Sequence, residues 1–157
     1  MVQISTTGRE LVFEAAEYER RLALVQQAMD AAGLEVLLLH SPENIYYVSG
    51  YHTLGYFGYQ CLVIPRDGRP VHVIRAFEES NVRTKSWVSD FVGYADGGSP
   101  FEATVSALRE QQIDGKRIGV EKSAWFLTVA VFEQLATALD QATWIDASRL
   151  VDRVRLV

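Results

Sequence analysis

One short segment, residues 34–39, constrains the fold more than any other part of the chain. It reads Leu-Glu-Val-Leu-Leu-Leu, so nearly every residue in it is aliphatic. Short aliphatic runs of this kind are typical of strands buried on both faces, at the centre of a sheet covered by helices. Before it, residues 14–32 carry apolar side chains at helical spacing, and Gly33 follows where a helix end favours a left-handed residue. The apolar stripe consists of Tyr18, Leu22, Val25, Met29 and Ala32.

The rest of the chain alternates between helical and strand patterns. Further strands are expected at residues 57–64, 71–74, 91–94, 117–120 and 143–145, and helices after Ser41-Pro42, within 76–87, after Ser99-Pro100, at 128–139 and after Asp146. The turn at residues 66–69 joins two strand patterns, which predicts a hairpin and hence an antiparallel pair. The predicted fold class is therefore α/β, a mixed β-sheet with helices on both faces. Residues 1–13 carry no clear pattern and are expected to form an N-terminal arm before one domain over 14–157.

Composition excludes several classes of function. The net charge of −5 and the lack of a basic cluster argue against a nucleic-acid partner. No apolar run approaches the ~18 residues of a membrane span, and the first ten residues lack the pattern of a signal peptide. The one cysteine, Cys61, lies in an apolar run, which favours a buried thiol and excludes an internal disulfide. A reducing compartment, the cytoplasm, is expected.

The residues alone do not form a catalytic set. The three histidines, His40, His52 and His72, are scattered and show no metal-ligand spacing, so no metal site is expected in this chain. No G-x-S-x-G motif supports a serine nucleophile. Glu121 follows the strand at 117–120, where a capping or interface role is expected. Arg75 has the chemistry to hold a carboxylate, or it forms a salt bridge with Glu78 or Glu79.

An aromatic stretch, residues 46–59, has the composition of a ligand-contacting loop. It reads YYVSGYHTLGYFGY and contains most of the tyrosines of the chain. Tyrosine combines an apolar face with one polar tip, which suits a surface that holds a small polar molecule. Gly50, Gly55 and Gly58 allow sharp turns or a close approach of the backbone. The alternative is a tyrosine-rich loop that packs on its own domain.

Several segments in order resemble the N-terminal domain of the creatinase/prolidase (Xaa-Pro aminopeptidase-like) family. They are EYERRLALVQQAMDAAGLEVLLLHSPENIYYVSGY, then CLVIPRDGRPVHVIR, RIGVE and IDASRLVDRVRLV, and the match extends from about Glu14 to Val157. The resemblance implies a mixed α/β domain of ribonuclease-H-like topology, with no cofactor of its own. It also implies a larger C-terminal pita-bread domain that holds the chemistry, with a divalent metal in the peptidases. The segment 154–157 resembles the lead into that domain, so this chain alone is expected to be inactive.

The resemblance further implies a homodimer in which the N-terminal domain of one subunit closes the active site of the other. Creatinases carry Tyr-Phe-Gly-Arg in this loop, where this chain has Tyr56-Phe57-Gly58-Tyr59. A tyrosine cannot supply the guanidinium fork that holds a carboxylate, which disfavours creatine and leaves a dipeptide or another small amide as substrate. The residues expected to contact substrate across the dimer are Tyr56, Phe57, Tyr59, His52 and Arg75.

Two other functions stay open at this point. The first is a stand-alone small-ligand-binding or regulatory module of the same fold. The second is a small enzyme in its own right, with His52 and Tyr59 as acid–base groups.

Overall fold

Strand β3 (Val36–Leu39) lies at the centre of a six-stranded sheet, as its aliphatic sequence predicts. The computed structural model describes residues 3–4, 8–112 and 116–156. The strand order is β6-β5-β4-β3-β7-β8, and β3 pairs antiparallel with β4 and parallel with β7. The other strands are β4 (Cys61–Pro65), β5 (Val71–Arg75), β6 (Phe91–Tyr94), β7 (Arg117–Val120) and β8 (Thr143–Asp146). The mixed sheet and the predicted hairpin, β4–β5, are both confirmed.

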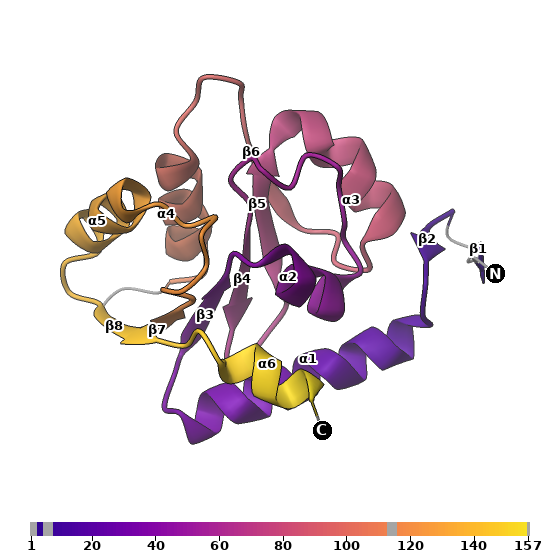
Figure 1. The fold of residues 1–157 in the computed structure, drawn as a ribbon, viewed down its shortest axis with the longest axis horizontal. Coiled ribbons are helices and arrows are strands. Elements are labelled where there is room, and N and C mark those ends of the chain that lie inside the picture. The colour runs from indigo at the N-terminus through magenta and orange to yellow at the C-terminus, as the bar shows by residue number, and fades with distance from the viewer. Residues whose placement is uncertain (1–2, 5–7, 113–115, 157) are drawn as a thin grey trace.

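Helices cover both faces of this sheet (Figure 1). One face carries α1 (Ala15–Ala31), α2 (Pro42–Ser49), α3 (Glu79–Lys85) and α6 (Leu150–Arg155), and the other carries α4 (Pro100–Glu110) and α5 (Val129–Ala138). A 3-10 turn, η1 (Ala76–Glu78), links β5 to α3. Figure 1 also shows α6 lying alongside α1. In the parts of the chain that the structure describes, no helix combines the length and apolar composition needed to cross a bilayer.

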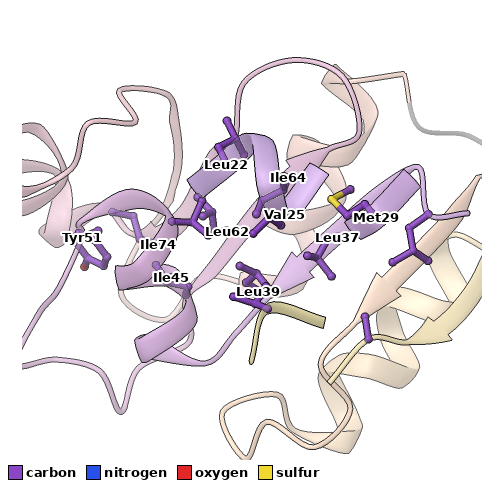
Figure 2. Packing of buried hydrophobic residues seen from close by; sticks show 14 of the residues in the cluster. Leu22, Val25, Met29, Leu37, Leu39, Ile45, Tyr51, Leu62, Ile64 and Ile74 are labelled. Carbon is purple, nitrogen blue, oxygen red and sulfur yellow. The ribbon is translucent and has the colours of Figure 1, made fainter. Parts of the chain in front are cut away.

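Alternate side chains of β3 belong to two separate cores, because successive residues of a strand point to opposite faces. Leu37 and Leu39 pack in the cluster that contains Val25 and Met29 of α1 (Figure 2). Val36 and Leu38 pack in the cluster that contains residues of α4 and α5. Each of these side chains is fully buried or nearly so, which contributes roughly 1.5–3 kcal/mol per side chain before entropy is counted. The sheet is therefore covered on both faces, as predicted.

Cys61 begins β4 and is completely buried in the cluster beneath α4 and α5. Its backbone lies opposite Val73 of β5 in the antiparallel register. Burial raises the pKa of the thiol far above its usual range, because an apolar interior disfavours the thiolate. The predicted buried structural thiol is confirmed.

Two element boundaries differ from the sequence prediction. Tyr46 and Tyr47 belong to helix α2, which ends at Gly50 with φ 78°, so the aromatic connection is residues 50–60. Strand β4 begins at Cys61, although the apolar pattern predicts a start at residue 57. The reason is that Gly55 and Gly58 close a turn through the Gly58 N–H to Gly55 carbonyl bond of 3.0 Å, which takes Phe57 out of the ladder.

The residues before α1 make contacts at both of their described parts. Strand β1 (Gln3–Ile4) pairs antiparallel with β2 (Glu10–Leu11). Arg9 donates from Nη1 to the Trp87 carbonyl at 2.6 Å, and Leu11 is buried. Residues 9–11 of this segment, predicted as an arm, therefore lie against the end of α3.

Candidate functional site

The candidate site lies at the edge of the sheet where the carboxyl ends of β3, β5, β6, β7 and β8 meet. These strands all run in one direction, because β3 is parallel to β7, β7 to β8, and β5 to β6, while β4 opposes both β3 and β5. The connection 50–60 enters β4 at this same edge. In α/β sheets the carboxyl edge of the strands is the usual place for a ligand.

Five apolar and aromatic residues of two loops lie at this edge, all of them exposed except the half-buried Phe126. We name them the ring surface: Leu54, Tyr56, Phe57, Trp125 and Phe126. Leu54 is 94% exposed, Phe57 78% and Trp125 81%. The rings form a continuous series, with centroid distances of 6.2 Å from Phe57 to Tyr56, 6.2 Å from Tyr56 to Phe126 and 4.6 Å from Phe126 to Trp125. Adjoining exposed rings of this kind are typical of interaction sites.

Two of these five residues, Trp125 and Phe126, were not identified from the sequence. They follow β7, about seventy residues after Phe57 in the chain. The signal was present, because an aromatic pair directly after the carboxyl end of a parallel strand faces the candidate edge. Using it required the order of the strands, which the sequence does not supply.

Arg75, at the end of β5, lies beside the aromatic connection. Its Cδ is 3.4 Å from the position that a side chain at Gly58 would occupy. The guanidinium donates to Asp96 Oδ1 from Nε at 3.0 Å and from Nη2 at 2.7 Å, which raises the pKa of Arg75. The predicted pairing with Glu78 or Glu79 is thus corrected to Asp96, which the loop after β6 brings to the same edge.

His52 lies at the start of the connection and packs elsewhere. Its ring meets Tyr46 of α2 edge-on at 5.7 Å, and Nδ1 lies 3.4 Å from the Gly50 carbonyl. The structure therefore brings Tyr56 and Phe57 together, places Arg75 next to them, and leaves His52 against α2.

Tyr59 points its hydroxyl into the domain. The oxygen lies 2.9 Å from Thr104 Oγ1 and 3.3 Å from His40 Nε2, and burial raises the pKa of Tyr59 well above its usual range. This orientation separates the Tyr59 hydroxyl from the exposed rings of Tyr56 and Phe57, only a few residues earlier.

The hydrogen bonds around Tyr59 assign its proton and that of His40. Thr104 donates its own proton to the Pro100 carbonyl at 2.8 Å, so the Tyr59 hydroxyl donates to Thr104. With both of those bonds formed, the contact between His40 and Tyr59 requires donation from Nε2, as in the neutral Nε2–H tautomer. Burial lowers the pKa of His40 to about 3, consistent with a ring that is uncharged at neutral pH. Among the described residues, His40 Nδ1 has no hydrogen-bond partner.

Glu121, at the end of β7, is a buried carboxylate with three hydrogen bonds. It accepts from the backbone N–H of His40 at 2.6 Å and of Ser41 at 2.8 Å, and from Asn44 Nδ2 at 2.6 Å. Burial raises the pKa of Glu121, and these bonds oppose that rise. The predicted capping role is confirmed, because Glu121 satisfies amides at the start of α2 where the Ser41 side chain makes no capping bond in the described structure.

Asn44 connects Glu121 to helix α6. Its Oδ1 accepts from Arg155 Nη1 at 2.7 Å, and its Nδ2 also lies 3.3 Å from Asp152 Oδ1. The end of α6 is thus joined to the polar groups beneath the aromatic connection. Neither this group nor any other in the described part of the chain brings together three or more histidine, cysteine, aspartate or glutamate side chains suited to a metal ion.

A separate groove of about 1160 Å³ lies between α1 and α6. Its lining includes the apolar residues Leu24, Ala28, Leu150 and Val154 and, among its charged residues, Arg20 and Arg153. It belongs to a different part of the molecule from the ring surface, because none of the ring-surface residues lines it.

Comparison with known proteins gives one family model and a consistent set of relatives. The model of the creatinase/prolidase N-terminal domain matches residues 21–157. The putative dipeptidase YkvY of Bacillus subtilis (strain 168) is 28% identical over 137 residues, which is 87% of this chain and 37% of the relative. This chain spans about two fifths of the length of the curated relatives it matches.

Solved structures share the fold. The crystal structure of a proline dipeptidase from Streptococcus pneumoniae TIGR4 aligns with a TM-score of 0.74 at 24% identity and covers 87% of this chain and 97% of its own. Dipeptidase PepE from Mycobacterium ulcerans aligns with a TM-score of 0.73 at 25% identity and covers 96% of this chain and 38% of its own. The predicted α/β fold class is confirmed.

Proposed function

This chain belongs to the creatinase/prolidase N-terminal domain family, and we propose from that premise that it is the non-catalytic domain of a longer hydrolase. In this proposal the protein is a homodimer, and the domain of one subunit closes the active site of the other. The substrate is a dipeptide or another small amide. Bond cleavage, with a divalent metal where one is used, belongs to the C-terminal pita-bread domain, and the protein works in the cytoplasm.

The observation that supports this role most strongly is the ring surface. Phe57 and Trp125 remain 78% and 81% exposed at the carboxyl edge of the sheet, although each lies beside another ring. Exposed rings lose water-accessible area when a second surface meets them, which contributes about 25 cal/mol per Å² buried. A lid that excludes water from a neighbouring active site uses this property, because water exclusion strengthens the polar contacts inside.

The predicted contact residues receive different roles in the proposal. Tyr56 and Phe57 supply the apolar face of the lid, and Arg75 supplies a cation beside it. Tyr59 supports the loop from within, because its hydroxyl is engaged with Thr104 and His40. His52 lies at the hinge side of the connection, against Tyr46.

The test uses the full-length natural protein that contains this domain, assayed with divalent metal on Xaa-Pro dipeptides. The double variant Phe57→Ala/Trp125→Ala is expected to raise KM about tenfold, as the loss of roughly 1–1.5 kcal/mol of apolar contact implies. Val12→Ala, which removes a half-exposed apolar side chain of the N-terminal segment, serves as the control and leaves KM unchanged.

Mixed dimers decide whether the lid acts across subunits. One subunit carries the double variant with an intact catalytic domain, and the other carries the normal ring surface with an inactivated catalytic domain. A lid that acts on the partner restores normal KM in the mixed dimer, since the intact domain then faces the intact catalytic site. No restoration contradicts action across the dimer, and turnover by the 157-residue chain alone contradicts the non-catalytic role.

A further inference from the structure

A line of hydrogen bonds runs from the end of α6 to the base of the aromatic connection. Arg155 donates to Asn44 Oδ1, and Asn44 donates from Nδ2 to Glu121. Glu121 accepts the backbone N–H of His40, whose ring reaches the Tyr59 hydroxyl. The line therefore joins α6, α2, β7 and β4 through groups that are distant in sequence.

We propose that Arg155, Asn44 and Glu121 are positioning residues that set the placement of Tyr59, and with it the aromatic connection, according to where α6 lies. The functional meaning of this coupling rests on the proposed lid role of the aromatic connection. The physical coupling rests only on the contacts within this chain.

The first step of the coupling is the orientation of the Asn44 amide. The acceptor oxygen and the donor nitrogen of an amide lie in one plane, on either side of its central carbon. While Arg155 occupies Oδ1 at 2.7 Å, Nδ2 faces the Glu121 carboxylate at 2.6 Å. Without Arg155, Oδ1 loses its donor and the amide is held only through Nδ2, by Glu121 Oε1 at 2.6 Å and Asp152 Oδ1 at 3.3 Å. The position of Asn44 relative to the Glu121 carboxylate is then less firmly set.

The second step is the backbone at the end of β3. One oxygen of Glu121, Oε2, accepts from both His40 N and Ser41 N, at 2.6 and 2.8 Å. A shift of the carboxylate therefore moves or releases both amides together. Burial makes this step stiff, because Asn44, Glu121 and His40 are almost completely inaccessible, and water is not available there to replace a lost bond.

The third step is the contact between His40 and Tyr59. The two rings meet edge-on with centroids 5.5 Å apart, and Nε2–H donates to the hydroxyl at 3.3 Å. Tyr59 in turn is held by Thr104 of α4. Movement of the His40 backbone thus changes one of the hydrogen bonds described for the Tyr59 hydroxyl.

The experiment records amide exchange and ring signals by NMR on the 157-residue chain carrying Arg155→Ala. We expect exchange of the His40 and Ser41 amides to accelerate about tenfold, as the loss of one hydrogen bond to a charged group implies. We also expect the His40 Nε2–H signal and the Tyr59 ring signals to shift. The conservative variant Arg155→Lys keeps one donor for Asn44. It is therefore expected to show exchange rates and signals close to those of the unmodified chain.

Arg153→Ala is the matched control, because Arg153 lies on the same helix, the substitution removes the same charge, and its side chain makes none of the hydrogen bonds found among the described residues. It is expected to change exchange at His40 by less than about twofold, within the usual effect of a surface substitution. Tyr59→Phe tests the line from its other end and should shift the Asn44 side-chain amide signals, since coupling between two sites is reciprocal.

The inference is overturned if Arg155→Ala alters only the amides of α6, or if Arg153→Ala has an equal effect on His40. These signals are read without any catalytic assay, so the outcome is independent of the lid proposal. A normal KM in the Phe57/Trp125 variant, together with a shifted Tyr59 signal in Arg155→Ala, would contradict the lid proposal and support the coupling. A raised KM together with an unshifted Tyr59 signal would contradict the coupling and support the lid proposal.

Discussion

The tip and the base of the aromatic connection differ in nearly every physical property, although they lie only a few residues apart. At the tip, Tyr56 and Phe57 are exposed, and their rings lie beside one another and beside Phe126. At the base, the Tyr59 hydroxyl is buried and held by Thr104 and His40. The comparison teaches that the role of a tyrosine here depends on what lies beneath it, and that a rigid base allows an exposed tip to keep its shape without packing of its own.

The largest difference between the two regions should appear in stability at low pH. Acid destabilises the base of the aromatic connection, because that region contains the buried ring of His40. A second fully buried ring, His72, bonds Ser86 Oγ at 3.0 Å. Burial lowers the pKa of both histidines to about 3. Below pH 6.5 both rings are therefore protonated in the unfolded chain but stay neutral in the folded chain. The free energy of unfolding then falls by about 1.4 kcal/mol per pH unit for each ring.

Between pH 6.5 and 4.5 the two histidines together remove up to about 5 kcal/mol of stability. The raised pKa of Glu121 acts in the opposite direction and offsets part of this loss, because the folded state takes up that proton more readily. Urea unfolding at several pH values measures the net slope. A stability that is flat down to pH 4.5 would contradict the buried neutral state of both rings.

Truncation of Glu121 should be the next largest effect. Glu121→Ala leaves the His40 and Ser41 amides and the Asn44 side chain without their acceptor, and we expect a loss of about 3–5 kcal/mol. Glu121→Gln keeps one carbonyl oxygen for these donors, so a loss of about 1–2 kcal/mol is expected. Urea unfolding at neutral pH measures both values. Equal losses in the two variants would show that packing, and not the hydrogen bonds, sets the cost.

The smallest effects sharpen the comparison within the connection itself. Tyr59→Phe deletes a buried hydroxyl and leaves the His40 Nε2–H without its acceptor, for which we expect a loss of about 1–2 kcal/mol. Phe57→Ala at the exposed tip should change stability by no more than about 0.5 kcal/mol. Thermal or urea unfolding of the two variants side by side checks the difference. A larger loss in Phe57→Ala would place the tip in the core.

The sequence predicted the layers of the fold better than the contacts of the site. Helix α1 and strand β3 carry their period in local residues, so their type and nearly their ends were correct. The helix start after Ser99-Pro100 was also correct, and the Ser99 hydroxyl there accepts the Glu102 N–H three residues ahead. Each of these features depends on neighbours in the chain.

The errors and omissions involve partners far apart in sequence. Asp96, and not Glu78, pairs with Arg75 because strand β6 lies beside β5, and Trp125 joins the ring surface because β7 lies beside β3. The early start predicted for β4 failed for a local reason, since apolar Phe57 continues the strand pattern while Gly58 turns the backbone. Physical pairing across a sheet depends on strand order, which a single sequence leaves open.

The single cysteine of the chain gives a way to observe opening of the sheet without any engineered label. Cys61 is completely buried in β4, one of the two central strands of the sheet, and its thiol resists ionisation. An alkylating reagent reacts with the exposed thiolate, so the folded domain should be modified only as fast as β4 separates from its neighbours. The rate of alkylation therefore measures how often the interior of the sheet opens.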